Sequence, residues 1–89
     1  MKFEWDTAKA AANFTKHGVS FEDAAQAFED ELSATFPDPD HSRGEYRYIT
    51  YGLIADGGLL VVSHTERNDL IRIISARLAT RKERQRYEN

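Results

Sequence analysis

The amino-acid sequence predicts a single α+β domain in which two N-terminal helices and a short C-terminal helix pack on an antiparallel sheet. Helix signals occur early in the chain, and the later part alternates apolar and polar side chains in short runs, the period of β-strands. The chain has 89 residues, of which 40% are hydrophobic and 30% charged. Residues 1–89 are therefore expected to share one hydrophobic core.

The first strand and the first helix have clear local signals. Residues 1–5 alternate apolar and polar side chains, which predicts a short strand. Asp6 is a suitable N-cap for a helix over Thr7–His17. Gly18 follows that helix and can adopt the left-handed conformation that ends it.

A second helix is expected to begin at Ser20, because apolar residues recur at helical spacing from Phe21 to Phe28. It is expected to end at Asp30 and Glu31, before an extended segment over 32–36 and a proline-rich loop. The later strands follow from alternation and from turn residues such as Asp56-Gly57-Gly58. They are predicted over 46–53, 59–65 and 70–76, and a capping box, Thr80 to Glu83, predicts a helix over 81–87.

Composition argues against several classes of protein. With no cysteine, the chain has no disulfide, thiol nucleophile or cysteine zinc site. Neither a membrane-spanning apolar run nor a signal-peptide pattern is present, so a cytoplasmic protein without a membrane partner is expected. The sequence also lacks histidine pairs at metal-binding spacing and a glycine-rich phosphate loop, so neither a metal nor a cofactor is predicted.

The net charge of −3 is unevenly distributed along the chain. Residues 1–45 carry a net charge of −6, whereas residues 46–89 carry +3. Seven of the eight basic residues in the second part lie from Arg67 onward, and six of those seven are arginines, which bind phosphate in a bidentate manner. The basic half therefore predicts a phosphate-bearing ligand.

Five polar residues near the ends of the last two predicted strands could support metal-independent RNA cleavage, in which the ribose 2′-hydroxyl attacks the adjacent phosphate. The reaction needs a base, an acid and cations that stabilise the charge on phosphorus. Histidine and glutamate could transfer the protons, and arginines could hold the phosphate. The candidate catalytic residues are His64, Glu66, Arg67, Arg72 and Arg77. Alternatively, Arg72 forms an ordinary ion pair with Glu66, Asp69 or Glu45.

The predicted C-terminal helix carries Arg81 and Lys82 in its first turn, where the helix dipole disfavours cations. With Arg84 they could extend an RNA-binding surface; the alternative is a solvated, frayed tail.

Aromatic residues also allow two interpretations. The cluster Tyr46, Arg47, Tyr48 and Tyr51 could stack on RNA bases, although packing within a sheet is the more frequent role of such residues. His41 lies in an acidic loop and is expected at the surface.

Two segments of the sequence resemble the BrnT family of bacterial type II toxins. The first contains Phe3-Glu4-Trp5-Asp6, Lys9, Asn13, Lys16-His17-Gly18-Val19-Ser20-Phe21, Ala24-Ala25 and Phe28. The second contains His64-Thr65-Glu66-Arg67, Ile71-Arg72-Ile73-Ile74-Ser75-Ala76-Arg77, Ala79, Glu83-Arg84 and Tyr87-Glu88. Thr7 stands where many members have proline, and both residues suit a first helical turn.

This resemblance implies a RelE-like fold and a ribonuclease that stops translation. It implies neutralisation by a BrnA-type ribbon-helix-helix antitoxin, in a heterotetramer of two toxins and two antitoxins that binds operator DNA only through the antitoxin. It adds Lys16 and His17 to the candidate RNA-binding residues. Two alternatives stay open: a non-catalytic nucleic-acid-binding module, and a co-repressor that only binds its antitoxin.

Overall fold

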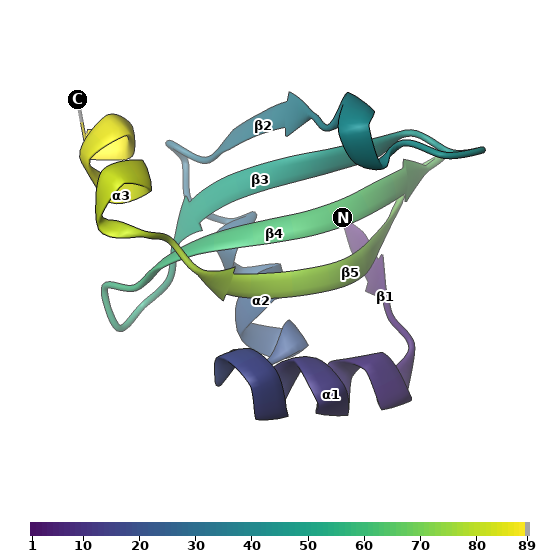
Figure 1. Cartoon of the computed structure of the whole chain (residues 1–89), viewed down its shortest axis with the longest axis horizontal. Coiled ribbons are helices and arrows are strands. Elements are labelled where there is room, and N and C mark those ends of the chain that lie inside the picture. Colours follow the sequence, from purple (N-terminus) through teal and green to yellow (C-terminus); the bar gives the residue numbers. More distant parts are fainter. Residues whose placement is uncertain (89) are drawn as a thin grey trace.

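The computed structural model describes residues 1–88 and contains three α-helices, five strands and one 3-10 helix. Their order is β1 (Lys2–Glu4), α1 (Thr7–His17), α2 (Phe21–Ala27), β2 (Ala34–Pro37), η1 (Pro39–His41), β3 (Arg47–Leu53), β4 (Leu59–Arg67), β5 (Leu70–Leu78) and α3 (Arg81–Glu88). Helices α1 and α2 lie below and behind the sheet in Figure 1, whereas α3 lies beyond the far end of β5. The predicted α+β class is confirmed.

The sheet is mixed, which corrects the prediction of an antiparallel sheet. Its strand order is β1-β5-β4-β3-β2, and β2 to β5 are antiparallel neighbours (Figure 1). Strand β1, however, pairs in parallel with the start of β5 and places Glu4 opposite Arg72. Two helices separate β1 from the other strands, and such a crossover can deliver a strand to the sheet edge in a parallel orientation.

Helix α1 begins and ends where the sequence predicts. The Asp6 carboxylate accepts hydrogen bonds from the backbone N–H groups of Ala8 and Lys9, and Gly18 ends the helix with a φ of 71°. From the middle of α1, the buried Asn13 amide donates to the Ala76 carbonyl at 2.9 Å and accepts from the Ala76 N–H at 3.1 Å. Asn13 thus supplies hydrogen-bond partners for the Ala76 backbone, at a part of the β5 edge that lies beyond the end of β1.

Helix α2 is shorter than predicted and ends at Ala27. Its N-cap is Ser20, whose hydroxyl accepts the Asp23 N–H at 3.0 Å. After Ala27 the backbone tightens, because the N–H of Phe28 bonds to Ala25 three residues earlier. The next segment turns toward β2, which begins at Ala34 instead of residue 32.

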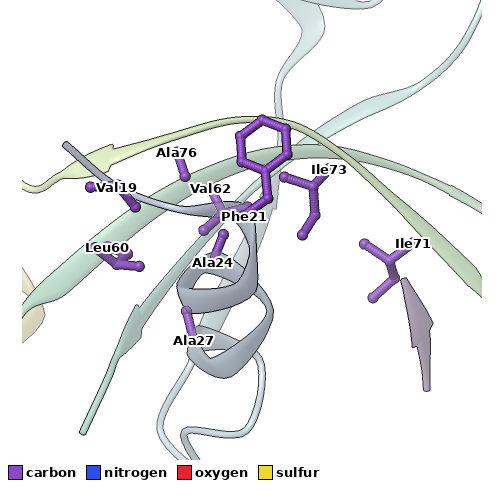
Figure 2. Packing of buried hydrophobic residues seen from close by; sticks show 9 residues of the cluster. All are labelled: Val19, Phe21, Ala24, Ala27, Leu60, Val62, Ile71, Ile73 and Ala76. Atoms are coloured by element: carbon purple, nitrogen blue, oxygen red, sulfur yellow. The ribbon is translucent and has the colours of Figure 1, made fainter. Parts of the chain in front are cut away.

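The core lies between α2 and one face of the sheet, which we call the covered face (Figure 2). It consists of Val19, Phe21, Ala24, Ala27, Leu60, Val62, Ile71, Ile73 and Ala76. The backbone of β3 approaches α2 closely at Gly52, where an added Cβ would lie 2.1 Å from the Ala27 carbonyl oxygen. The opposite face, which we call the open face, carries no helix except α3 at one end.

A β-bulge in β5 decides which side chains reach the open face. Ser63 pairs with Ser75 but His64 pairs with Ile73, so Ile74 is an extra residue in β5. Strict alternation would place Arg77 on the same side as Ile73, as the sequence suggested. The bulge instead turns Arg77 to the open face, where Arg72 also lies.

Candidate functional site

Four polar side chains form a row across the open face. The strand register places Arg47 of β3 opposite Thr65 of β4, Thr65 opposite Arg72 of β5, and Arg72 opposite Glu4 of β1. Arg72 donates from Nη1 to Glu4 at 2.6 Å. None of the three acidic partners that the sequence suggested for Arg72 is the one observed.

The centre of this row contains buried polar atoms without a hydrogen-bond partner. Thr65 is only 2% exposed, and its Oγ1 has no partner within residues 1–88. The Nε–H of Arg47, which is also buried, likewise lacks a hydrogen bond within the described chain. Buried polar atoms are normally paired, so an unpaired hydroxyl beside an unpaired guanidinium N–H indicates a place for water or a polar ligand.

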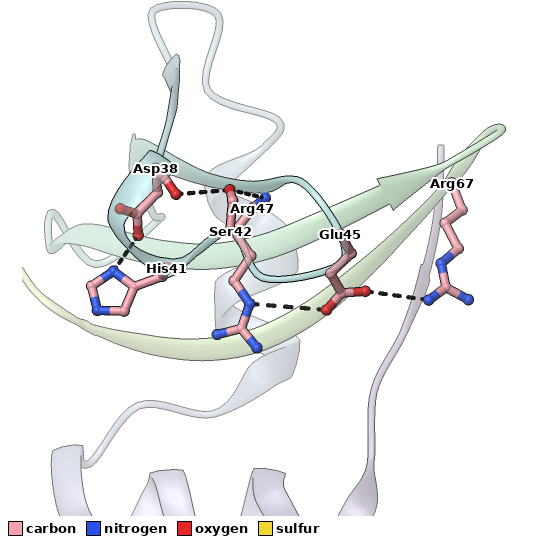
Figure 3. Close-up of polar contacts among 6 residues, drawn as sticks. All are labelled: Asp38, His41, Ser42, Glu45, Arg47 and Arg67. Atoms are coloured by element: carbon pink, nitrogen blue, oxygen red, sulfur yellow. Dashed lines mark hydrogen bonds and ion pairs between the residues drawn. The ribbon is translucent and has the colours of Figure 1, made fainter.

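Glu45 gathers two arginines at the same end of the sheet (Figure 3). One carboxylate oxygen accepts from Arg67 Nη2 at 3.2 Å, and the other lies 3.9 Å from Arg47 Nε. Both arginines keep further N–H donors beyond these contacts. The side chains of Arg67, Arg72 and Arg47 thus lie at one end of the open face, although the sequence reasoning did not select Arg47 as a site residue.

Arg77 lies at the other end of the open face and pairs with α3. Its Nη1 and Nη2 donate to the two oxygens of Glu83 at 2.8 and 3.0 Å, and Nη1 also donates to the Leu78 carbonyl. Glu83 completes the predicted capping box with Thr80. The hydrogen bond and charge of Arg77 lower the pKa of Glu83 to about 2. The Arg77 Nε–H and one Nη2 hydrogen remain without a partner within residues 1–88, which leaves a two-donor fork for an anion.

A groove separates α3 from the neighbouring strands on the open face. Its volume is about 630 Å³, within the range of small-molecule sites. It is lined by Leu32, Ala34, Phe36, Ile49, Tyr51, Glu83, Arg86 and Tyr87. Of the three tyrosines considered for base stacking, only Tyr51 lines this groove, and burial raises the pKa of its phenol. Tyr87 hydrogen-bonds to Asp30 and ties the end of α3 to the rest of the molecule.

His64 and Glu66 lie on the covered face, apart from the arginines. His64 is fully buried against Phe28, and its Nε2 lies 2.7 Å from the Thr50 hydroxyl. Burial lowers the pKa of His64 to about 4, so the ring is neutral at pH 7. Its Nδ1 lies 3.5 Å from a Glu66 oxygen. This Thr–His–Glu order resembles a hydrolase triad, but Thr50 is completely enclosed and cannot meet a substrate.

The remaining predicted RNA-binding residues fall on two separate elements. Lys16 and His17 are exposed in the last turn of α1, on the helical side of the molecule. Arg81 and Lys82 are exposed in the first turn of α3. Arg84 donates to the Gly57 carbonyl at 3.3 Å and approaches Glu88 at 3.7 Å. The structure therefore does not bring all ten predicted site residues into one surface.

A family model described as the ribonuclease toxin BrnT of type II toxin-antitoxin systems matches residues 5–83. The chain belongs to the BrnT family. No curated protein sequence matches it. Its BrnT fold is similar to the crystal structure of the Brucella abortus ribonuclease toxin BrnT, with a TM-score of 0.71 and 24% identity over 91% of this chain and 99% of that one.

Two further findings on this BrnT-family protein concern metal ligands and membrane-spanning helices. The described residues bring together no group of three or more histidine, cysteine, aspartate or glutamate side chains that could hold a metal ion. Within residues 1–88, no helix is both long enough and apolar enough to cross a membrane.

The sequence placed Arg47 only within the tyrosine cluster and did not select either Arg47 or Thr65 as a site residue, because nothing in their own neighbourhoods marks them as such. Arg47 stands among tyrosines in a typical strand pattern, and Thr65 is a common strand residue. Their significance comes from the register of β3, β4 and β5. For this BrnT-family chain, the available signal was the alternation that puts Thr65 on the same face as Arg67.

Proposed function

We propose that this protein is a metal-independent endoribonuclease that cleaves RNA through attack of a ribose 2′-hydroxyl on the adjacent phosphate, and so inhibits translation. Membership of the ribonuclease toxin family supports RNA as the substrate. The single observation that carries the proposal is the row on the open face, in which Arg47, Thr65 and Arg72 are neighbours and neither Thr65 Oγ1 nor Arg47 Nε forms a hydrogen bond within the described residues. That row offers hydrogen-bond donors for a phosphate.

The chemistry assigned to the row is charge stabilisation. As the 2′-oxygen attacks, negative charge grows on the non-bridging phosphate oxygens, and preorganised donors stabilise it without a metal ion. Arg72 and Arg47, whose side chains are 42% and 36% exposed, would bind these oxygens beside Thr65, and Arg67 would hold a neighbouring phosphate. Arg77, positioned by Glu83, would hold the chain near the groove through its free fork.

His64 and Glu66 receive a different assignment in this proposal. The neutral, enclosed His64 ring fixes Thr50 and supports the covered face. Glu66 stays beside it at 3.5 Å and does not share a face with Arg72. We therefore place both residues outside the reacting groups.

The partner proposed for this toxin is a BrnA-type ribbon-helix-helix antitoxin, in a complex of two toxins and two antitoxins in the cytoplasm. Operator DNA would be bound through the antitoxin alone. The toxin-antitoxin character of the family supports an antitoxin partner. The cationic open face supports the expectation that an acidic segment of the antitoxin covers the arginines and blocks RNA.

The decisive experiment measures growth of cells that express the protein and RNA cleavage by the purified protein in vitro. Wild-type protein expressed without antitoxin should arrest growth, and purified protein should cut RNA in the presence of EDTA. The products should carry 2′,3′-cyclic phosphate and 5′-hydroxyl ends. If expression does not slow growth and the purified protein leaves RNA intact, the proposal is wrong. If EDTA abolishes cleavage, the reaction is not metal-independent.

A non-catalytic RNA-binding or co-repressor function is the second candidate, and one observation favours it. Each arginine proposed to act is already engaged by a carboxylate of its own chain: Arg67 by Glu45, Arg72 by Glu4 and Arg77 by Glu83. Such pairing suits a surface that binds RNA or an antitoxin without reacting. Salt-sensitive RNA binding without any cleaved product would select this candidate.

A further inference from the structure

We propose that His41, held by Asp38, is the group that accepts the 2′-hydroxyl proton during RNA cleavage. This inference rests on the function proposed above and supplies what the open-face row lacks, a group that can take a proton. Sequence reasoning treated His41 as an ordinary surface residue of an acidic loop. In the structure, the imidazole of His41 is hydrogen-bonded to the carboxylate of Asp38 (Figure 3).

The loop that carries His41 is tied to the arginine row by its backbone. The N–H of Asp38 donates to the Arg47 carbonyl at 2.8 Å, and the Ser42 hydroxyl donates to the Asp38 carbonyl at 2.9 Å. The Arg47 N–H in turn donates to the Ser42 hydroxyl at 2.9 Å. These three hydrogen bonds hold residues 38–47 as a closed loop. The backbone around His41 is therefore fixed to Arg47, the first residue of the row.

The two members of the pair differ in exposure in the way a proton-transfer pair requires. His41 Nδ1 lies 2.9 Å from Asp38 Oδ2; the side chain of Asp38 is only 15% exposed, whereas that of His41 is 69% exposed. An ionised carboxylate can only accept hydrogen bonds, so in the neutral ring the proton is on Nδ1 and the Nδ1–H group donates a hydrogen bond to Asp38. Nε2 then holds the lone pair, on a side chain that is largely exposed. Asp38 acts as the positioning residue.

His64 provides an internal contrast. Its ring also has a carboxylate near Nδ1, but at 3.5 Å, and its Nε2 faces the enclosed Thr50 hydroxyl. An RNA hydroxyl cannot reach that nitrogen. Of the three histidines in the chain, His41 alone combines an exposed ring with a sheltered carboxylate partner in the described structure.

The proposed step balances as follows. The 2′-oxygen forms a bond to phosphorus while its proton passes to His41 Nε2, which becomes an imidazolium stabilised by Asp38. The bond between phosphorus and the 5′-oxygen breaks, and the leaving oxygen takes a proton from solvent water. The imidazolium returns its extra proton to solvent, and the products are a 2′,3′-cyclic phosphate and a 5′-hydroxyl.

Other charged groups lie on the same loop and at the start of β3. They are Asp40, Arg43, Glu45 and Arg47. Glu45 is engaged by Arg67 at 3.2 Å, so its charge is largely balanced. None of these four groups is shown bonded to the ring in the described structure, whereas Asp38 is.

The test compares His41→Asn with the control Lys9→Gln, because Lys9 is exposed on α1 and is not among the candidate site residues. The substrate is a single-stranded RNA oligonucleotide, and a 2′-O-methyl version of it reports binding without cleavage. We expect His41→Asn to slow cleavage about 100- to 10,000-fold, the usual contribution of a general base, with unchanged affinity for the methylated strand. Lys9→Gln should cleave like wild type.

Asp38→Asn tests the positioning role. It should reduce cleavage less than His41→Asn and shift the acidic limb of the pH–rate profile, a readout that a purely structural residue would not move. Cleavage by His41→Asn within twofold of wild type would overturn the inference while leaving the ribonuclease function intact. A wild-type protein that binds the methylated strand but never cleaves the RNA would instead overturn the proposed function, and this role with it.

Discussion

Two consecutive residues of β4, His64 and Thr65, project from opposite faces of one sheet into different surroundings. On the covered face, His64 packs against Phe28 and bonds to Thr50, and its environment keeps it uncharged. On the open face, Thr65 is just as buried, yet its hydroxyl lies between two arginines without a partner within residues 1–88. Each of the two residues keeps one buried polar atom without a hydrogen bond in the described chain, His64 Nδ1 and Thr65 Oγ1, but only Thr65 has an arginine on each neighbouring strand.

The largest effect should come from breaking the covered face at Gly52. A Gly52→Val substitution puts a branched side chain where a Cβ already meets the Ala27 carbonyl oxygen at 2.1 Å. Separating β3 from α2 should cost about 3 kcal/mol or more, which is enough to unfold a small domain. Urea unfolding followed by circular dichroism measures it. Gly58→Ala, where the nearest atom is the Asp56 side chain at 3.1 Å, should change stability little.

The second prediction concerns the neutral His64. Its pKa of about 4 in the folded protein lies below the unfolded value of 6.5, so the unfolded chain binds more protons between these two pH values. The stability linked to His64 is complete above pH 6.5 and is lost as the pH falls toward 4, by about 3 kcal/mol at most. Unfolding free energies measured by urea at pH 7, 5.5 and 4.5 give the slope.

His64→Gln should flatten the slope over that interval, because glutamine does not titrate. His17→Gln is the control, since an exposed histidine should leave the slope unchanged. The pKa of Glu83 is 4.5 in the unfolded chain and about 2 in the folded one, so Glu83 adds to the slope only at the lowest of the three pH values. If His64→Gln keeps the pH dependence of the wild-type unfolding free energy, the buried His64 ring is not the source of that dependence.

The third prediction sharpens the open face. Arg72→Gln removes the guanidinium beside Thr65 but leaves an exposed polar side chain, so RNA cleavage should fall about 100-fold. Stability should fall by no more than about 1 kcal/mol, because the Arg72–Glu4 pair is partly solvated. Cleavage rates and thermal melting measure the two effects. Lys9→Gln, on the exposed side of α1, should alter neither; equal losses in both variants would show only a general charge effect.

The smallest effect is expected from α3. Replacing Arg81 and Lys82 together by glutamine should weaken RNA binding a few-fold and lower the slope of log affinity against log salt concentration by about 1.4, which is about 0.7 for each charge on a single strand. Both residues are exposed, so folding should be unaffected. Fluorescence anisotropy of a labelled single strand at several salt concentrations measures this change. An unchanged salt dependence would mean that α3 lies outside the RNA path.

Local signals predicted the elements of the fold well, because each is encoded over a few residues. The Asp6 cap, Gly18 and the Thr80–Glu83 capping box lie where expected. The parallel pairing of β1 could not be predicted, because alternation in residues 1–5 reports a strand but not its neighbour. The end of α2 was misplaced because Phe28 continues the apolar spacing while its backbone leaves the helix.

For the candidate site, sequence identified charges but not their arrangement. Arg67, Arg72 and Arg77 share the open face as a group only because Ile74 forms a bulge, and nothing in the sequence marks that residue as the extra one. Arg47 and His41 became visible only through register and loop hydrogen bonds. Long-range pairing is the information that one sequence does not reveal.

The parallel pair of β1 and β5 also has a consequence for folding kinetics. Glu4 and Arg72 are 68 positions apart, and closing so long a loop costs entropy that must be paid before the contact forms. During synthesis the N-terminal residues leave the ribosome long before β5, so β1 has no partner to pair with until most of the chain has emerged. The proposed phosphate row is consequently assembled late. A nascent chain cannot act on the RNA around it until its last strand is in place.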